Sequence, residues 1–289
     1  MAEQFARTGT ESMKNWLAPA KLNLFLHVLG QRDDGFHELQ TLFQLLDFGD
    51  NLSFEITLDG RVERSDHPGL PEDDLTILAA RALKNYSHCE LGVKISLDKR
   101  IPLGAGLGGG SSDAGTTLVA LNKLWNLGLS RQCLSEIGLG LGADIPFFVG
   151  GHSAWAEGVG ELLTPAQLPD RYYCVVWPQV KVPTAAIFSD PELTRNTPPI
   201  RIPSPTHADW RNDLEPVTRK RFPEVGQCLE WLSQFGVAQM SGSGSAVFLI
   251  TESDQSGEEI IKQLPAFLSG LVARGINHNP AFFEELSGV

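Results

Sequence analysis

The 289-residue sequence has little cysteine and no long apolar run. Its four cysteines lie far apart and form no Cys-x-x-Cys pair, so the sequence supports neither a zinc site nor a redox motif. We expect reduced thiols, which are typical of a cytoplasmic protein. No apolar run approaches the roughly 18 residues that span a bilayer, so we expect no membrane association.

Basic residues are also scarce. Lysine and arginine number 23 against 35 aspartates and glutamates, which gives a formal net charge of −12. A general nucleic-acid-binding protein usually carries a basic face, so that class is disfavoured. Residues 1–15 lack the apolar core of a signal peptide and contain two acids, which disfavours a transit peptide as well. We expect a polar extension there.

The rest of the chain mixes strand-like and helix-like segments. A hydrophobic fraction of 42% is ample for a core, and the mixture predicts an α+β fold in two lobes, which we place at 16–178 and 179–289. The expected strands are 17–30, 38–58 with a break near 47–50, 93–98, two around 239–250, and 267–274. The expected helices are 75–86, 114–125, 222–235 and 256–264, and a Pro-rich connection covers 189–206. We expect Asp73 or Asp74 to cap the first helix, and Ser111, Ser112 or Asp113 the second.

The stretch PLGAGLGGGSSDAG, residues 102–115, is where the chain is unusually rich in glycine. Six of its fourteen residues are glycine, each costing up to about 1 kcal/mol relative to alanine in regular structure. A flexible linker would join domains, whereas this stretch lies between an expected strand and an expected helix. A loop that opens a helix offers free N–H groups and the positive end of the helix dipole to an anion. The stretch therefore predicts a cradle for nucleotide phosphates.

Three better-known glycine motifs do not fit this stretch. Residues 104–109 satisfy G-x-G-x-x-G, but Lys99 to Pro102 separate them from the strand and no acid follows about 20 residues later. No Gly-Lys-Ser/Thr follows the glycines, as a Walker loop requires. Ser111 stands where a protein-kinase loop has valine. A dinucleotide site, a Walker site and a protein-kinase loop are all disfavoured.

Four blocks of the sequence resemble the GHMP kinases, a superfamily that includes galactokinase, homoserine kinase and mevalonate kinase. The glycine-rich stretch is similar to their phosphate-binding loop. The other blocks are APAKLNLFLHVLGQRDDGFHELQTLFQLLDFGD (18–50), LGADIPFFVGG (141–151) and QMSGSGSAVFLI (239–250). The extra glycines of GLGGGSSDA and the first block are typical of the branch that acts on a cytidylylated methylerythritol. The resemblance covers about residues 16–275.

This resemblance implies a fold, a reaction and a cofactor. The fold is a two-lobed GHMP kinase fold with an N-terminal ribosomal-protein-type α/β domain, a C-terminal ferredoxin-like domain and the active site between them. The reaction is ATP-dependent phosphorylation of the 2-hydroxyl of 4-diphosphocytidyl-2-C-methyl-D-erythritol, on the non-mevalonate route to isoprenoid precursors. The cofactor is ATP with Mg²⁺, and the partner is a small molecule that contains a cytidine diphosphate.

Asp144 and Lys21 are the candidate catalytic residues. From the residues alone, Asp144 is either a general base or the cap of a helix that begins near Pro146, and Lys21 is either functional or a solvated lysine on a half-exposed strand. The resemblance implies that Asp144 takes the proton of the attacking hydroxyl, while Lys21 holds it ionised and orients that hydroxyl. Asn23 lies on the same strand face as Lys21, and the resemblance implies that it binds the substrate.

Phe36, His37 and Phe188 are the candidates for binding the cytosine. Without the resemblance, Phe36 has no structural need to lie exposed on its loop, although it could simply anchor that loop. The interpretation of Phe188 stays open. The resemblance implies that the two rings stack on the base and that His37 hydrogen-bonds it. The family commonly has tyrosine at the position of Phe36, so the stacking face is kept here and the phenol is lost.

The remaining candidates surround the phosphates. The second glycine-rich loop is either a hairpin turn or a second side of the phosphate-binding site, and its candidate residues are Ser241, Gly242 and Ser243. Lys99 is a candidate for lining the adenine pocket. Asp113 either acts on a cation through water or caps its helix, and we assign no metal ligand. The residues expected to bind the nucleotide in the glycine-rich stretch are Pro102, Gly104, Ala105, Gly106, Leu107, Gly108, Gly109, Gly110, Ser111 and Ser112.

Three other functions remain open from the sequence. Another GHMP kinase would phosphorylate a different small alcohol such as homoserine or mevalonate. A decarboxylase of the diphosphomevalonate type uses the same scaffold, but would have no use for Phe36 and His37. A non-catalytic nucleotide-binding protein would keep the glycine-rich loop without needing Asp144.

Overall fold

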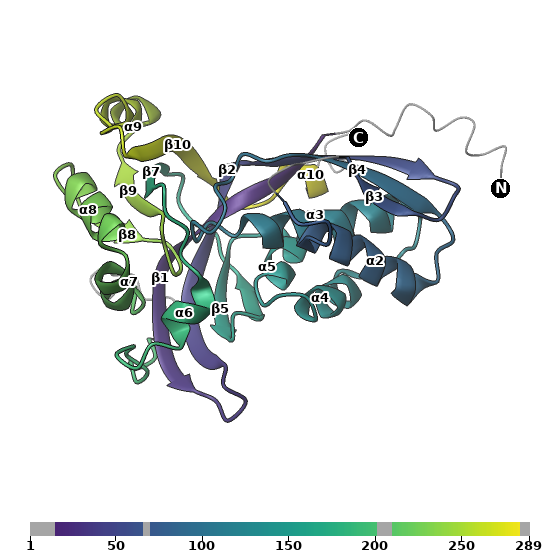
Figure 1. Ribbon diagram of the computed structural model, residues 1–289, viewed down its shortest axis with the longest axis horizontal. Coiled ribbons are helices and arrows are strands. Elements are labelled where there is room, and N and C mark those ends of the chain that lie inside the picture. Colours follow the sequence, from purple (N-terminus) through teal and green to yellow (C-terminus); the bar gives the residue numbers. More distant parts are fainter. Residues whose placement is uncertain (1–14, 66–69, 201–209, 284–289) are drawn as a thin grey trace.

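The computed structural model describes residues 15–65, 70–200 and 210–283, in which helices and strands form an α+β fold (Figure 1). The residues so described include a ten-stranded sheet, whose main path runs β3-β4-β2-β10-β7-β9-β8. Strands β1 and β5 also pair with β2, and β6 pairs with β5. None of the described helices is long and apolar enough to cross a membrane. The expected extension at 1–15 lies almost wholly outside the described residues.

The N-terminal part is built on the long hairpin β1 (Trp16–Gln31) and β2 (His37–Thr57). Strand β4 (Gly92–Asp98) extends the sheet beside β2. Its other elements are β3 (Val62–Arg64), α2 (Leu75–Ser87), α3 (Gly109–Leu124), α4 (Arg131–Leu139), α5 (Ile145–Gly150), β5 (Ala154–Gly158) and β6 (Leu162–Pro165).

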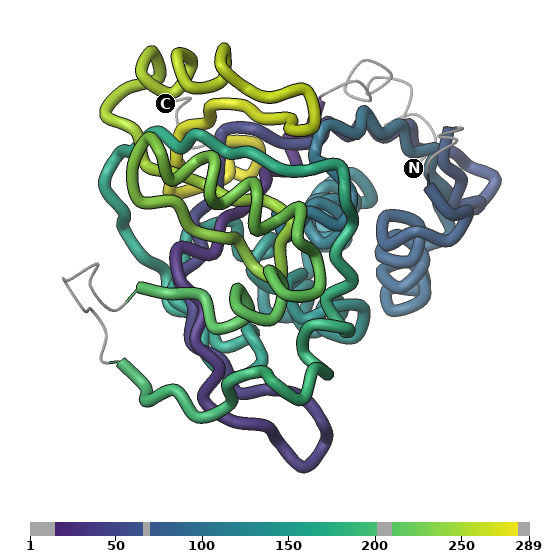
Figure 2. Tube along the Cα trace, turned by 60° about the vertical axis from the view of Figure 1, so that its left-hand side comes forward, coloured from purple at the N-terminus to yellow at the C-terminus, as the bar shows by residue number. Residues whose placement is uncertain are grey.

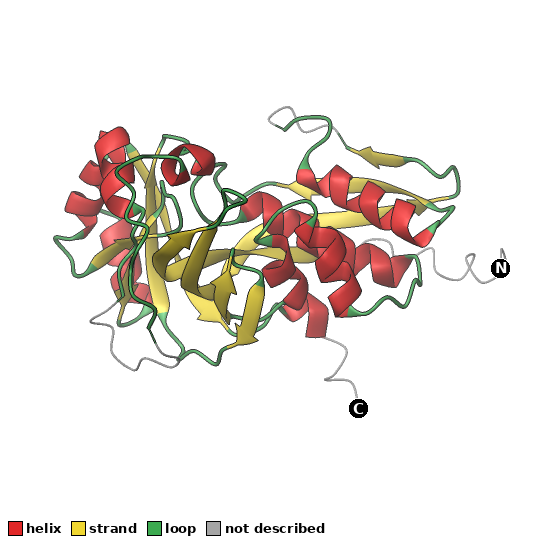
Figure 3. Cartoon of the chain, turned by 90° about the horizontal axis from the view of Figure 1, so that it is seen from below, coloured by secondary structure: helices red, strands yellow, loops and turns green. Residues whose placement is uncertain are grey.

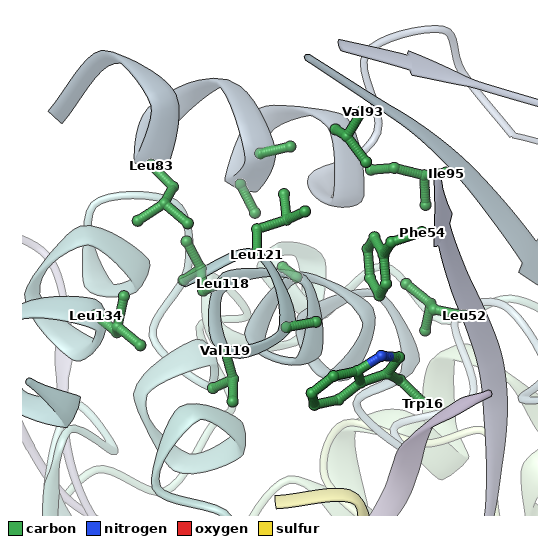
Figure 4. Packing of buried hydrophobic residues seen from close by; sticks show 14 of the residues in the cluster. Trp16, Leu52, Phe54, Leu83, Val93, Ile95, Leu118, Val119, Leu121 and Leu134 are labelled. Carbon is green, nitrogen blue, oxygen red and sulfur yellow. The ribbon is translucent and has the colours of Figure 1, made fainter. Parts of the chain in front are cut away.

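The main core of this part lies between the sheet and the helices. Figure 4 shows Phe54 and Ile95 from the strands facing Leu118 and Leu121 of α3, with Leu83 of α2 beside them. All five side chains are almost completely buried. Burial of this apolar surface, at about 25 cal/mol per Å², stabilises the position of α3 and hence of the glycine-rich loop that opens it.

The C-terminal part is an antiparallel sheet of β7 (Tyr172–Pro178), β8 (Ala238–Met240), β9 (Val247–Thr251) and β10 (Leu268–Ile276). Strand β10 ends by pairing with Leu45 and Leu46 of β2, which joins the two parts of the sheet. Figure 3 shows the helices gathered in two groups with strands between them. The helices of this part are α6 (Thr184–Phe188), α7 (Glu215–Arg221), α8 (Pro223–Leu232) and α9 (Asp254–Ile261), and a last turn, α10 (Pro280–Phe283), returns to the first part.

The expected break near 47–50 is wrong. Strand β2 continues through it, because Asp50 and Gly49 pair with Ala18 and Pro19 of β1. A Cβ atom at Gly49 would lie only 2.2 Å from the carbonyl oxygen of Ala18, so glycine here permits a close approach of strands instead of a turn.

The second helix begins earlier than expected. Helix α3 starts at Gly109 and not at 114, and its N-cap is Gly108, at φ +75°, with no side-chain cap. The three glycines 108–110 therefore belong to the helix entry itself. The cap expected for α2 is confirmed at Asp74, whose carboxylate accepts from the N–H groups of Thr76 and Ile77. The Pro-rich connection has no helix or strand over 189–200, and its remainder lies outside the described residues.

Asp50 and Lys99 tie the glycine-rich loop to the sheet. The buried Asp50 carboxylate accepts from the backbone N–H groups of Arg100 (2.5 Å) and Ile101 (2.7 Å) and from Lys99 Nζ (2.5 Å). Lys99 Nζ also lies 2.7 Å from Asp113 Oδ2 on α3. One buried cluster thus joins β2, the start of the loop and the helix that follows it.

We predict that Asp50→Ala lowers the free energy of unfolding by about 3–5 kcal/mol, because a buried ammonium and two backbone N–H groups lose their acceptor. The matched control is Asp98→Ala. The Asp98 carboxylate pairs with Arg100 at the surface, so we expect its removal to lower the free energy of unfolding by less than about 1 kcal/mol. Urea unfolding of both variants measures the difference. Equal losses would contradict the role of Asp50.

Candidate active site

One cleft of about 730 Å³ contains most of the expected site. Its walls come from both parts of the chain: the glycine-rich loop and Lys21 on one side, Gly242, Ser243 and Phe188 on the other. Asp144, Asn23, Phe36, His37 and Lys99 line it as well. Residues separated by more than 200 positions therefore share a single space.

Lys21 and Asp144 come together in this cleft. Lys21 Nζ lies 3.7 Å from Asp144 Oδ2, donates to Asn23 Oδ1, and stands 5.1 Å from the ring centroid of Phe43. Lys21 is buried, so the alternative of a solvated lysine is excluded. Burial lowers the pKa of its ammonium, and the neighbouring Asp144 carboxylate opposes that shift.

Asp144 does not use its carboxylate as a helix cap. It occupies the N-cap position of α5, but its side chain accepts no capping hydrogen bond. The carboxylate points to Lys21 and keeps 36% of its side-chain surface exposed to the cleft. A carboxylate beside a buried cation, and open to a ligand, has the geometry that a general base needs.

The first turn of α3 is a potential anion site. The N–H groups of Gly109, Gly110 and Ser111 have no acceptor among the described residues, since the first one bonded is Ser112 N–H, to Gly108 O. They lie at the positive end of the helix dipole and line the cleft. These backbone donors suit an anion such as a phosphate, and the phosphate cradle stays a prediction.

A side chain at Gly106 or at Gly108 would collide with other parts of the protein. A Cβ atom at Gly106 would lie 2.3 Å from the carbonyl oxygen of Ser241, and one at Gly108 would lie 2.7 Å from Phe148 Cζ. Both have φ +75°. Glycine at both positions therefore permits close contacts within the protein, and both residues also line the cleft, where nucleotide binding stays a prediction.

Ser241 and Ser112 do not line the cleft. Ser241 Oγ accepts from Asn23 N–H and donates to Gly106 O, each at 3.1 Å, so it joins β1 to the glycine-rich loop. Ser112 Oγ donates to Pro19 O at 2.7 Å. Both hydroxyls are buried supports of the site.

A second cavity of about 290 Å³ adjoins the loop on the side of α2. Leucines 70, 75, 78 and 103 give it apolar walls, and Lys99, Gly110 and Asp113 also line it. The ammonium of Lys99 is taken up by Asp50 and Asp113, so Lys99 borders this cavity mainly with its alkyl chain.

The aromatic residues lie at the other end of the main cleft. Phe36 is 60% exposed, in the turn between β1 and β2. The rings of His37 and Phe188 lie 5.1 Å apart at 38°. Two further residues that the sequence did not suggest are present here: Arg195 donates to His37, and Thr184 Oγ1 is hydrogen-bonded to Ser243 Oγ at 2.9 Å.

Comparisons with known proteins identify the family of this chain. The family model described as "GHMP kinases N terminal domain" matches residues 74–152, and "GHMP kinases C terminal" matches 204–270. A protein of Thiobacillus denitrificans named 4-diphosphocytidyl-2-C-methyl-D-erythritol kinase is 53% identical, over 92% of this chain and 96% of its own. The chain belongs to this family of GHMP kinases. A kinase of the same name from Halorhodospira halophila is 52% identical, over 92% of this chain and 94% of its own.

Solved structures confirm the expected GHMP kinase fold. A crystal structure of 4-(cytidine 5'-diphospho)-2C-methyl-D-erythritol kinase has a TM-score of 0.80 and 34% identity, covering 91% of this chain and 99% of that one. The mevalonate kinase of Methanococcus jannaschii has a TM-score of 0.65 at 15% identity, covering 93% and 100%, and shares the fold alone.

We predict that Gly110→Val weakens ATP binding by about 1–3 kcal/mol, because a Cβ at Gly110 points toward Leu75 and the larger side chain fills the space between the two cavities. The matched control is Gly150→Val, where a Cβ would meet nothing within 4 Å. Calorimetric titration with ATP measures both, and thermal unfolding verifies that both fold. Equal ATP affinity in the two variants would show that the nucleotide lies elsewhere.

Proposed function

We propose that this protein transfers the γ-phosphoryl group of ATP to the 2-hydroxyl of 4-diphosphocytidyl-2-C-methyl-D-erythritol, the substrate for which its relatives are named. One observation of the structure carries this proposal: a single cleft holds the glycine-rich helix entry, the Lys21–Asp144 pair and the aromatic residues. These three groups suit the phosphates, the reacting hydroxyl and a flat base.

We propose that ATP binds at the glycine-rich loop and in the second cavity. The free N–H groups of α3 suit the phosphates, and the leucine-lined cavity on the far side of Gly110 suits the adenine. The described residues contain no group of three His, Cys, Asp or Glu side chains that would hold a metal ion. We therefore propose that Mg²⁺ enters with ATP, held chiefly by phosphate oxygens, and supplies charge neutralisation there.

Asp144 is the proposed general base. Its exposed carboxylate accepts the proton of the 2-hydroxyl as the oxygen attacks the γ-phosphoryl group. The Lys21 ammonium stabilises the ionised carboxylate and orients the hydroxyl beside it. Asn23, held by Thr41 Oγ1 (2.9 Å) and by the bond to Lys21, keeps that ammonium in place.

The two parts of the chain divide this work. We propose that residues 16–178 bind ATP and carry the catalytic pair, while residues 179–289 complete the substrate side of the cleft. We also infer a cytoplasmic location, since all four cysteines are free thiols, as a reducing compartment would keep them.

The proposal is tested by coupled detection of ADP with a panel of alcohols. We expect turnover with 4-diphosphocytidyl-2-C-methyl-D-erythritol and little with mevalonate, homoserine or methylerythritol phosphate. The last compound lacks only the cytidylyl group. Equal use of methylerythritol phosphate would remove the role of the aromatic residues and indicate a kinase of a smaller alcohol.

For the catalytic pair, we predict that Asp144→Asn lowers kcat about 10²–10⁴-fold, since the amide keeps the shape and cannot take the proton. Lys21→Ala is expected to be severe as well. If the pair acts as one unit, the double variant loses much less than the product of the two single losses. Multiplicative losses in kcat would show independent roles.

For the base-binding end, we predict that Phe36→Ala lowers kcat/KM for the full substrate roughly 5- to 150-fold, because aromatic stacking on a base is worth about 1–3 kcal/mol. The matched variant Phe36→Tyr keeps the ring face and is expected to behave like the wild type. The ATP affinity of both variants is measured to show whether the effect is confined to the base-binding end of the cleft. A loss in ATP affinity in Phe36→Ala would contradict this assignment.

A further inference from the structure

Arg195 lies behind the aromatic end of the cleft and does not line it. Its Nε donates to His37 Nε2 at 2.9 Å, and its terminal nitrogens donate to the carbonyl oxygens of Phe188 (2.9 Å), Asp190 (2.8 Å) and Leu193 (3.2 Å). Figures 1 and 2 show the tip of the β1–β2 hairpin beside α6 and the segment that follows it. One guanidinium therefore holds a residue from each wall of the cleft.

The contact determines where the proton of His37 lies. A guanidinium remains protonated and has donors only, so His37 Nε2 must accept through its lone pair. A neutral imidazole then carries its proton on Nδ1. If His37 were an imidazolium, its Nε2–H would face the donor of Arg195. The pKa of His37 is lowered, first by burial and second by the charge of Arg195, and this also favours the neutral imidazole. Nδ1 makes no hydrogen bond to any residue that the structure describes, and His37 lines the cleft.

We propose that Arg195 is a positioning residue that fixes His37 as the neutral Nδ1–H tautomer, so that the cleft presents a donor to the acceptor edge of the pyrimidine. The inference rests on the proposed function. Cytosine has an acceptor at N3, whereas uracil has an N–H there. The same proton that bonds cytosine would meet another proton on uracil, and a buried donor left unpaired is costly.

Arg195 also limits the movement of the ring itself. The imidazole is bonded to Arg195 through Nε2, and it packs against the ring of Phe188, whose own carbonyl is bonded to the same guanidinium. His37 and Phe188 therefore keep one relative position, which a selective hydrogen bond requires. A purely structural clasp would hold the two segments together equally well but would have no effect on which base is preferred.

The first experiment reads the tautomer in the wild-type protein, with no substrate present. Long-range ¹H–¹⁵N spectra, with the His37→Gln variant used to assign the signal, report which ring nitrogen carries the proton. We expect the proton on Nδ1 near neutral pH. A proton on Nε2 would overturn the inference, whatever the substrate of the enzyme is.

The second experiment compares kcat/KM for the cytidine substrate with that for its uridine analogue. In Arg195→Met we expect the preference for cytidine to fall roughly 10-fold or more, because His37 is then free to carry its proton on either nitrogen. In Arg195→Lys the remaining donor keeps much of the preference while KM rises for both substrates. The control is Arg61→Met, because Arg61 is an exposed arginine that pairs with Asp59 and Glu63 at the surface.

The outcomes separate the inference from the proposed function. If the wild type does not phosphorylate the cytidine substrate, the proposed function fails, and the tautomer measurement still stands by itself. If it does, and Arg195→Met lowers kcat/KM equally for both bases, Arg195 is a structural clasp and the inference is wrong. A fall confined to the cytidine preference supports it.

Discussion

The close contact of two glycine-rich loops is the constraint on which the rest of the site depends. The backbone of Gly106 lies so near the carbonyl of Ser241 that no side chain fits between them. The Ser241 hydroxyl completes the contact by bonding both Gly106 O and the N–H of Asn23. One loop comes from each part of the chain, so their contact fixes the width of the cleft.

Burial of charge determines the chemistry that this cleft allows. Without Asp144 and Asn23, the buried ammonium of Lys21 would destabilise the folded protein, because a buried charge needs partners. The same need explains why the carboxylate of Asp144 faces Lys21 and leaves the helix α5 without a side-chain cap. A second buried ammonium, on Lys99, is neutralised by Asp50 and Asp113 and supports the loop instead of reaching the ligand. The two lysines are similarly buried but have different roles. The carboxylate that pairs with Lys21 is open to the cleft, whereas the carboxylates that pair with Lys99 are buried.

Several features followed from the sequence because they depend on local physics. The pattern of apolar residues over 17–30 predicted the first strand, and the glycine-rich stretch followed by serines predicted an anion site at the start of a helix. A cap at Asp73 or Asp74 could be predicted because a capping carboxylate acts on the N–H groups two and three residues later, and the structure shows that Asp74 is the cap. The blocks shared with GHMP kinases then supplied the fold, the reaction and most of the residues that line the cleft.

Other features were decided only when the chain folded, because they depend on residues far apart in sequence. Nothing near Gly106 indicates that Ser241 will exclude a side chain there, and nothing near Asp47 to Asp50 indicates that β1 will hold that segment as a strand. Arg195 lies in a segment with no periodicity, and its contact with His37 joins positions 158 residues apart. The sequence by itself determined several of the longer strands and helices, the position of the glycine-rich loop and the family. The tertiary structure decided which polar groups support the site and which face the cleft, since burial and pairing of charge exist only once distant segments meet.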